Sequence, residues 1–164
     1  MEMEKKYVGV IVRCRGEYWM EEFCSYYLSQ GVDEVHIIND GAPEKFYDNL
    51  NNNESIHIEH VKGPFDRAPN GQLHRKQMRF VNRHYGGIRG RFEWMIVCDA
   101  DEFITTRKNI NRTIREELKE TFEPNNVDII LVPWVIMSCG GRKKSPKSIL
   151  KGITKRWNHD KRHA

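Results

Sequence analysis

One stretch of the chain limits its fold more than any other, because an unbroken apolar run in it ends on three carboxylates. The run covers residues 94–98 and is followed by Asp99, Ala100, Asp101 and Glu102. A strand with apolar residues on both sides is typical of a parallel sheet that helices cover on both faces. The sequence therefore predicts a central strand of an α/β fold at this position.

The two aspartates after this run are spaced so that they can share one ligand. Because side chains alternate along a strand, Asp99 and Asp101 are expected on the same side, with the small Ala100 between them. Ligands of open α/β sheets bind at the carboxyl ends of strands, and two carboxylates there suit Mg²⁺ or Mn²⁺ carrying a diphosphate. The alternative is that the acids only end the strand and cap the next helix.

Strands and helices alternate along the rest of the chain. Further strands are predicted over residues 7–12, 35–40, 55–61, 127–134 and 148–157. Helices are predicted over residues 18–30, 72–84 and 109–122, with a short one before Leu50. Gly31 is expected to stop the first helix, whose aromatic residues are expected in the core. This order predicts an α/β/α sandwich with a mostly parallel central sheet.

Composition and length are typical of a globular protein with a single domain over residues 1–164. The alternative is that the chain is a fragment of a longer protein. Hydrophobic residues make up 38% and charged residues 30% of the chain. No apolar run approaches the roughly 20 residues that cross a bilayer, so no transmembrane segment is expected. The four cysteines form no C-x-x-C pair, which predicts buried free thiols and a cytoplasmic location.

Charge is distributed unevenly along the chain. The net charge is +4, but residues 141–164 carry nine Lys or Arg against Asp160 alone. A basic tail suits an anionic ligand, either nucleic acid or the phosphates of a small molecule, and a solvated basic surface is the plain alternative. Because no helix-turn-helix, zinc module or aromatic RNA-binding motif is present, nucleic acid is not the expected partner.

Polar residues follow the other predicted strands as well. Asp40 comes directly after the second strand and could accept an imide N–H, as in uracil, whereas Arg13 and Arg75 could each form paired hydrogen bonds with phosphate. The structural alternatives are an Asx turn for Asp40 and an exposed helix charge for Arg75. His57 and His60 are expected to be plain surface residues.

Four stretches in this order resemble glycosyltransferases of the GT-A fold. The strongest, residues 92–104, is similar to the W-(hydrophobic)-D-x-D-E-F signature of one subset of these enzymes, and residues 10–17, 35–40 and 133–144 support it. The family usually has Asn-Glu after the first strand, where this chain has Arg15, Gly16 and Glu17. The resemblance implies a GT-A, Rossmann-like fold and a metal-dependent glycosyltransferase.

The resemblance also implies the partners and the site of such an enzyme. Its donor would be a nucleoside-diphosphate sugar, with a UDP-sugar preferred, and its acceptor a glycan or glycoprotein hydroxyl. Mn²⁺ or Mg²⁺ would bind to Asp99 and Asp101. The candidate residues for the nucleotide sugar are Arg13, Glu17, Asp40, Gln72, Arg75, Asp99 and Ala100. His159 and Asp160 are the only candidates for the catalytic base, which is otherwise unknown.

Three other functions stay open at this point. A D-x-D metal-dependent phosphatase also uses acids at a strand end, although it expects them on the first strand. A nucleic-acid-binding protein would use the basic tail. A catalytically silent binder of sugar nucleotides would keep the donor site without the reaction.

Overall fold

The computed structural model describes residues 5–61, 72–106 and 109–156, and the side chains of residues 72–77 are outside the description. The chain divides into two compact units, Met1–Asn126 and Val127–Ala164. Within the described residues, no helix is long and apolar enough to cross a membrane. The single domain over residues 1–164 stays a prediction.

A four-stranded parallel sheet forms the centre of the first unit, with the strand order β3-β2-β1-β4. Its strands are β1 (Lys6–Cys14), β2 (Glu34–Asn39), β3 (Ile56–His60) and β4 (Phe92–Asp99). Val10 is in register with Val35 of β2 and with Ile96 of β4. All three strand pairs are parallel, so the carboxyl ends of the strands meet at one edge.

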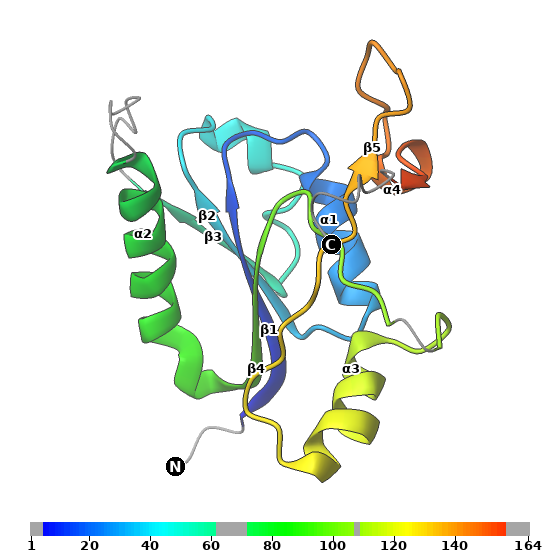
Figure 1. Ribbon diagram of the computed structural model, residues 1–164. Helices are drawn as coiled ribbons and strands as arrows, with labels where there is room; N and C mark the ends of the chain where they lie inside the picture. Colours follow the sequence, from blue (N-terminus) through cyan, green and yellow to red (C-terminus); the bar gives the residue numbers. More distant parts are fainter. Residues whose placement is uncertain (1–4, 62–71, 107–108, 157–164) are drawn as a thin grey trace. The chain divides into compact units, whose positions relative to one another are not determined.

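Helices flank the sheet, which confirms the predicted α/β class with its Rossmann-like arrangement (Figure 1). The longest helices are α1 (Met20–Ser29), which contacts β2, and α2 (Gln72–Ile88), which contacts β1. Shorter helical turns are η1 (Glu44–Tyr47) and η2 (Arg89–Arg91). The helices predicted over residues 18–30 and 72–84 are thus present, and α2 continues further than the sequence pattern predicted.

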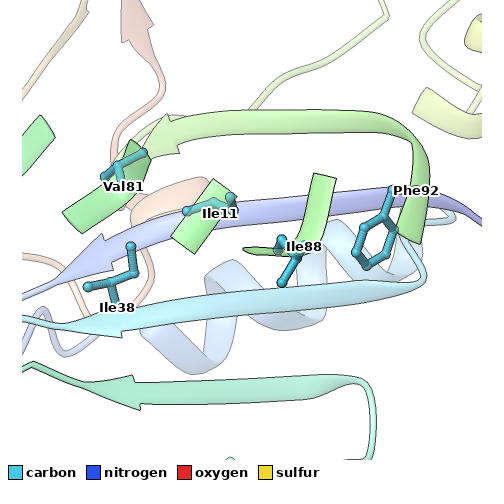
Figure 2. Close-up of a cluster of buried hydrophobic side chains, with 5 residues drawn as sticks. All are labelled: Ile11, Ile38, Val81, Ile88 and Phe92. Carbon is cyan, nitrogen blue, oxygen red and sulfur yellow. The ribbon is translucent and has the colours of Figure 1, made fainter. Parts of the chain in front are cut away.

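Apolar side chains fill the space between the sheet and α2 (Figure 2). Ile11 of β1 and Ile38 of β2 pack there against Val81 and Ile88 of α2 and against Phe92. Alternate residues of the same strands, such as Val10 and Ile37, are also fully buried, together with Phe23 and Tyr27 of α1. Burial on both faces of β1 and β2 explains why their sequences are almost continuously apolar.

The third helical segment begins later than predicted. It comprises α3 (Ile114–Glu117), η3 (Leu118–Phe122) and η4 (Glu123–Asn125). Thr113 caps it, because its hydroxyl accepts from the Glu116 N–H at 3.2 Å and the Glu116 carboxylate accepts from the Thr113 N–H at 2.7 Å. This capping box fixes the start of the helix, and Ile110 is left exposed outside it.

The prediction of a central strand at residues 94–98 was wrong in one respect. Among the residues that the structure describes, β4 is an outer strand of the sheet and pairs with β1 alone, and Val97 is half-exposed. Its apolar sequence indicated a buried strand, but the number of neighbours a strand has depends on distant parts of the chain.

The second unit contains less regular structure than predicted. Residues 127–134 form no strand, and Leu131 and Trp134 are exposed. An apolar run becomes a strand only where another strand takes its hydrogen bonds, and Pro133 offers no N–H. Residues 148–157 contain α4 (Ile149–Gly152), and the short β6 (Lys155–Arg156) pairs antiparallel with β5 (Met137–Ser138). Cys139 is exposed, so the prediction that all four thiols are buried was also wrong.

Gly31 ends α1 as the sequence predicted. Its φ is +81°, its N–H donates to the Leu28 carbonyl at 3.1 Å, and the Val32 N–H donates to the Tyr27 carbonyl at 3.2 Å. These two hydrogen bonds form a Schellman motif, which leads the chain from α1 into β2.

We expect Gly31→Ala to lower the free energy of unfolding by on the order of 1–3 kcal/mol. The left-handed backbone disfavours a side chain, and the added Cβ would lie 2.7 Å from the Arg115 Cβ. Urea denaturation measures the change. Gly86→Ala, which adds a methyl group in open space within α2, is the matched control and should not destabilise the protein.

Candidate functional site

The D-x-D segment leaves the carboxyl end of β4 in a tight turn. The Glu102 N–H donates to the Asp99 carbonyl at 3.1 Å, and the Glu102 carboxylate accepts from the Asp99 N–H at 2.9 Å. Asp99 and Asp101 are both exposed, and within the described residues neither carboxylate has a hydrogen bond or ion pair. The next helix begins only at Ile114, so these acids do not cap it. Within the described part of the chain, both carboxylates are therefore exposed and unpaired.

Three aromatic side chains of the α1 region hold the backbone that follows β4. Trp19 Nε1 donates to the Ala100 carbonyl at 2.8 Å, and the Tyr27 hydroxyl donates to the Glu102 carbonyl at 2.9 Å. The Tyr26 hydroxyl donates to the Ile104 carbonyl at 2.5 Å. Ala100 is buried by this arrangement, whereas the aspartates on either side of it are exposed. The aromatic stripe predicted as core thus also positions the D-x-D backbone.

Arg13 and Asp40 form an ion pair at the same edge of the sheet. Arg13 is in register with Ile38 on one side and with Asp99 on the other. Its guanidinium donates to Asp40 Oδ2 at 2.7 Å, and Arg15 Nε lies 3.6 Å from the same oxygen. Asp40 is only 2% exposed, and its other oxygen, Oδ1, has no hydrogen-bond partner among the described residues. A buried carboxylate oxygen without a partner is costly, and an N–H group of a ligand would relieve that cost.

The turn after β2 is closed by Asn39 and not by Asp40. Asn39 Oδ1 accepts from the Ala42 N–H at 2.8 Å, and Asn39 Nδ2 donates to the Ala42 carbonyl at 2.8 Å. The same Nδ2 lies 2.8 Å from His60 Nδ1, so His60 is exposed, as predicted, but also contacts the turn. Because Asn39 makes the side-chain hydrogen bonds of the turn, the Asp40 side chain can pair with Arg13.

Glu17 stabilises its own loop. Its carboxylate accepts from the Arg15 N–H at 2.5 Å, and that loop leads from β1 to Trp19. Two thiols lie near these segments, and burial raises the pKa of Cys14 to about 11 and that of Cys98 to about 12. Both stay protonated at neutral pH, which makes them poor nucleophiles.

The remaining candidates fall outside the described parts of the molecule. Gln72 and Arg75 lie in the first turns of α2, and the structure describes their backbone but not their side chains. His159 and Asp160 lie beyond the last described residue. The described site therefore consists of Asp99, Asp101, the Arg13–Asp40 ion pair and the groups that hold them.

Fold and site together define an α/β protein whose Rossmann-like parallel sheet carries acidic groups at its carboxyl edge. Comparison of the chain with protein-family models, with curated proteins and with solved structures finds no match.

Proposed function

We propose that the chain is a metal-dependent glycosyltransferase that transfers a sugar from a nucleoside-diphosphate sugar, preferably a UDP-sugar. The observation that carries the proposal is the pair of exposed carboxylates, Asp99 and Asp101, at the carboxyl end of β4. This edge of a parallel sheet is where α/β proteins bind nucleotides. The resemblance of residues 92–104 to the D-x-D-E-F signature of GT-A glycosyltransferases supports glycosyl transfer as the reaction.

The donor atoms fit Mn²⁺ or Mg²⁺. Asp99 and Asp101 offer hard carboxylate oxygens without competing partners in the described structure, and such ions keep several waters and substrate oxygens as further ligands. When bound, the metal would neutralise the negative charge of the diphosphate as it leaves.

The ion pair at the end of β1 and β2 supports nucleotide binding. Asp40 Oδ1 is a buried acceptor without a partner, and the N3–H of uracil is a donor of the right kind. Arg13 is held by Asp40, so it acts on a nucleotide through that ion pair or through its remaining N–H groups. Arg15, whose side chain is 41% exposed, is a further cation at this edge.

In the reaction, the acceptor oxygen forms a bond to the anomeric carbon while the bond from that carbon to the diphosphate oxygen breaks. The hydroxyl proton goes to a base, for which His159 and Asp160 are the candidates in this chain. The diphosphate leaves with the electron pair of the broken bond.

We expect UDP to bind in calorimetric titration when Mn²⁺ is present, and Asp101→Asn to weaken this binding by at least about tenfold, or about 1.4 kcal/mol. The reason is the loss of one charged metal ligand. Glu54→Gln replaces an exposed acid just before β3, at the opposite edge of the sheet, and is expected to leave binding unchanged. No binding with or without Mn²⁺, or equal binding by wild type and Asp101→Asn, would contradict the proposal.

The same titration with CDP examines the role of Asp40. Cytosine has no imide N–H, so UDP should bind more tightly than CDP to the wild type, and Asp40→Asn should remove that preference. Release of free sugar from UDP-sugars in the presence of Mn²⁺ then separates an enzyme from a silent binder.

A further inference from the structure

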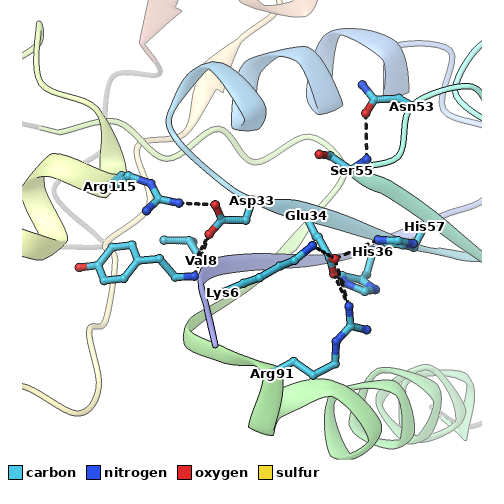
Figure 3. A network of polar contacts seen from close by, with 11 residues as sticks. Lys6, Val8, Asp33, Glu34, His36, Asn53, Ser55, His57, Arg91 and Arg115 are labelled. Carbon is cyan, nitrogen blue, oxygen red and sulfur yellow. Dashed lines mark hydrogen bonds and ion pairs between the residues drawn. The ribbon is translucent and has the colours of Figure 1, made fainter. Parts of the chain in front are cut away.

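A second group of polar side chains lies at the opposite, amino end of the sheet (Figure 3). Glu34 and His36 lie two residues apart on β2, so they face the same side of the sheet. His57 of β3 is in register with His36 and brings a second imidazole to that side. Glu34 and His36 are each 2% exposed, whereas the His57 side chain is 42% exposed. The group is therefore built into the sheet, with the His57 ring on its solvent-exposed side.

The ligand atoms of these three residues converge. One oxygen or nitrogen from each lies within 4.8 Å of the others. His36 Nε2 is 2.9 Å from Glu34 Oε2, and His57 Nε2 is 3.3 Å from Glu34 Oε1. The two imidazole rings stack with centroids 4.8 Å apart. His57 Nε2 is buried and makes no hydrogen bond within the described residues, so its contact with Glu34 Oε1 is an ion-pair distance without hydrogen-bond geometry.

Two histidines connect Glu34 with Glu59. His36 Nδ1 lies 3.1 Å from His84 Nε2, and His84 Nδ1 lies 2.5 Å from Glu59 Oε2. The contacts of His36 with Glu34 and of His84 with Glu59 each need an N–H group on the histidine. The contact between the two rings needs one more, which makes three N–H groups in all. Two neutral imidazoles supply only two N–H groups. The chain of hydrogen bonds is thus one proton short unless one ring is charged.

We propose that Glu34, His36 and His57 bind a divalent transition-metal ion, with Zn²⁺ as the expected ion. Two imidazoles and one carboxylate are a ligand set that Zn²⁺ uses, with a water at the fourth position. The site is independent of the proposed glycosyltransferase function, because it lies at the other edge of the sheet. Its effect would be to tie the outer strand β3 to β2.

A metal at this position accounts for the missing proton. With His36 Nε2 on the metal, His36 Nδ1–H donates to His84 Nε2, and His84 Nδ1–H donates to Glu59. Every contact of the chain is then satisfied by two neutral rings. Metal-bound histidines commonly donate their second N–H in this way, which orients the ring.

Two cations compete for the Glu34 carboxylate. Lys6 Nζ contacts Oε1, and Arg91 Nη2 lies 3.0 Å from both oxygens. Their side chains are 48% and 41% exposed, so each can turn toward solvent when a metal binds. Lys6 shares Oε1 with His57 and is the direct competitor. Removing the Lys6 ammonium group should therefore strengthen metal binding. This gain is not expected if Glu34 serves only to form ion pairs.

The test is a titration of tag-free, chelator-treated full-length protein with Co²⁺, followed by its visible absorption, and then displacement by Zn²⁺. We expect a first equivalent per chain with a ligand-field band from bound nitrogen ligands, whereas an ion at Asp99 and Asp101 would have oxygen ligands only. His57→Gln should weaken binding by at least about tenfold. Lys6→Met should tighten it. His57 is half-exposed on an outer strand, so its substitution is compatible with folding, which circular dichroism checks.

Two controls separate this site from other histidines. His60→Gln removes a histidine of the same strand, and the double variant His159→Gln with His163→Gln removes the histidines of the tail. Neither variant should change the affinity for the first Co²⁺ equivalent. Absence of stoichiometric binding by the wild type would overturn the proposal. Equal affinity of wild type and His57→Gln would do so as well.

Discussion

Lowering the pH from 7 to 3 is expected to reduce the free energy of unfolding by on the order of 3 kcal/mol in metal-free protein. Burial lowers the pKa of His36 from 6.5 to about 4. Burial alone would raise the pKa of Glu34, but hydrogen bonds from Lys6 and His36 and nearby positive charges outweigh it and lower that pKa from 4.5 to about 2. Both groups therefore resist protonation in the folded protein.

The direction of the pH dependence follows from proton uptake by the unfolded chain. Between pH 6.5 and 4 the unfolded chain binds a proton at His36 that the folded chain does not, and between pH 4.5 and 2 the same holds for Glu34. Stability must fall as the pH falls through both windows. Each shift alone corresponds to about 3 kcal/mol. The two amounts do not simply add, because the groups share a hydrogen bond and Lys6 and Arg91 are half-exposed.

Urea denaturation at pH 7, 5 and 3 with a chelator present measures this loss. Glu34→Gln should be less stable than the wild type at pH 7 and should lose less below pH 4.5, because it has no carboxylate to protonate. Glu54→Gln should follow the wild type, since Glu54 is exposed. The titratable groups that face Glu34 and His36 from neighbouring elements are Lys6, His57, Glu59, His84 and Arg91. A wild-type stability that is constant from pH 7 to pH 3 would contradict the prediction.

Tyr27→Ala is expected to lower the free energy of unfolding by roughly 3–5 kcal/mol. Tyr27 is fully buried, and its ring packs against Phe23 with centroids 4.6 Å apart. Its hydroxyl donates to the Glu102 carbonyl at 2.9 Å and accepts from the Ile104 N–H at 3.3 Å. The substitution thus opens a cavity under the sheet and releases the backbone that follows the D-x-D turn.

Tyr27→Phe separates the two contributions. It keeps the ring but leaves the backbone groups of Glu102 and Ile104 without the hydroxyl as a partner. We expect it to lower the free energy of unfolding by about 1–3 kcal/mol. Tyr85→Phe, at an exposed position of α2, should change stability by less than about 0.5 kcal/mol. All three variants can be compared by urea denaturation at pH 7. If Tyr27→Phe were as stable as the wild type, the hydroxyl would not hold the segment after β4.

Local sequence patterns were sufficient to predict several parts of the fold. The apolar runs of β1 and β2, the helical spacing of α1 and α2, and Gly31 at the end of α1 were all predicted correctly. In a parallel sheet these elements necessarily bring the ends of β2 and β4, and hence Asp40 and Asp99, to one edge. The late start of α3 was also readable, because the Thr113 to Glu116 spacing is that of a capping box.

Contacts between distant residues could not be predicted in this way. The edge position of β4, the pairing of Arg13 with Asp40, and the hydrogen bonds of Trp19 and Tyr27 to the backbone after β4 join residues far apart in the chain. His57 looked like a surface residue until β3 set it beside His36. Periodicity reports which side of an element is apolar, whereas strand order, register and the partners of polar side chains depend on long-range packing. The sequence by itself therefore determined the strands and long helices of the parallel sheet and its acidic edge. Only the tertiary structure decided which charges are paired, which are free and where imidazoles contact a carboxylate.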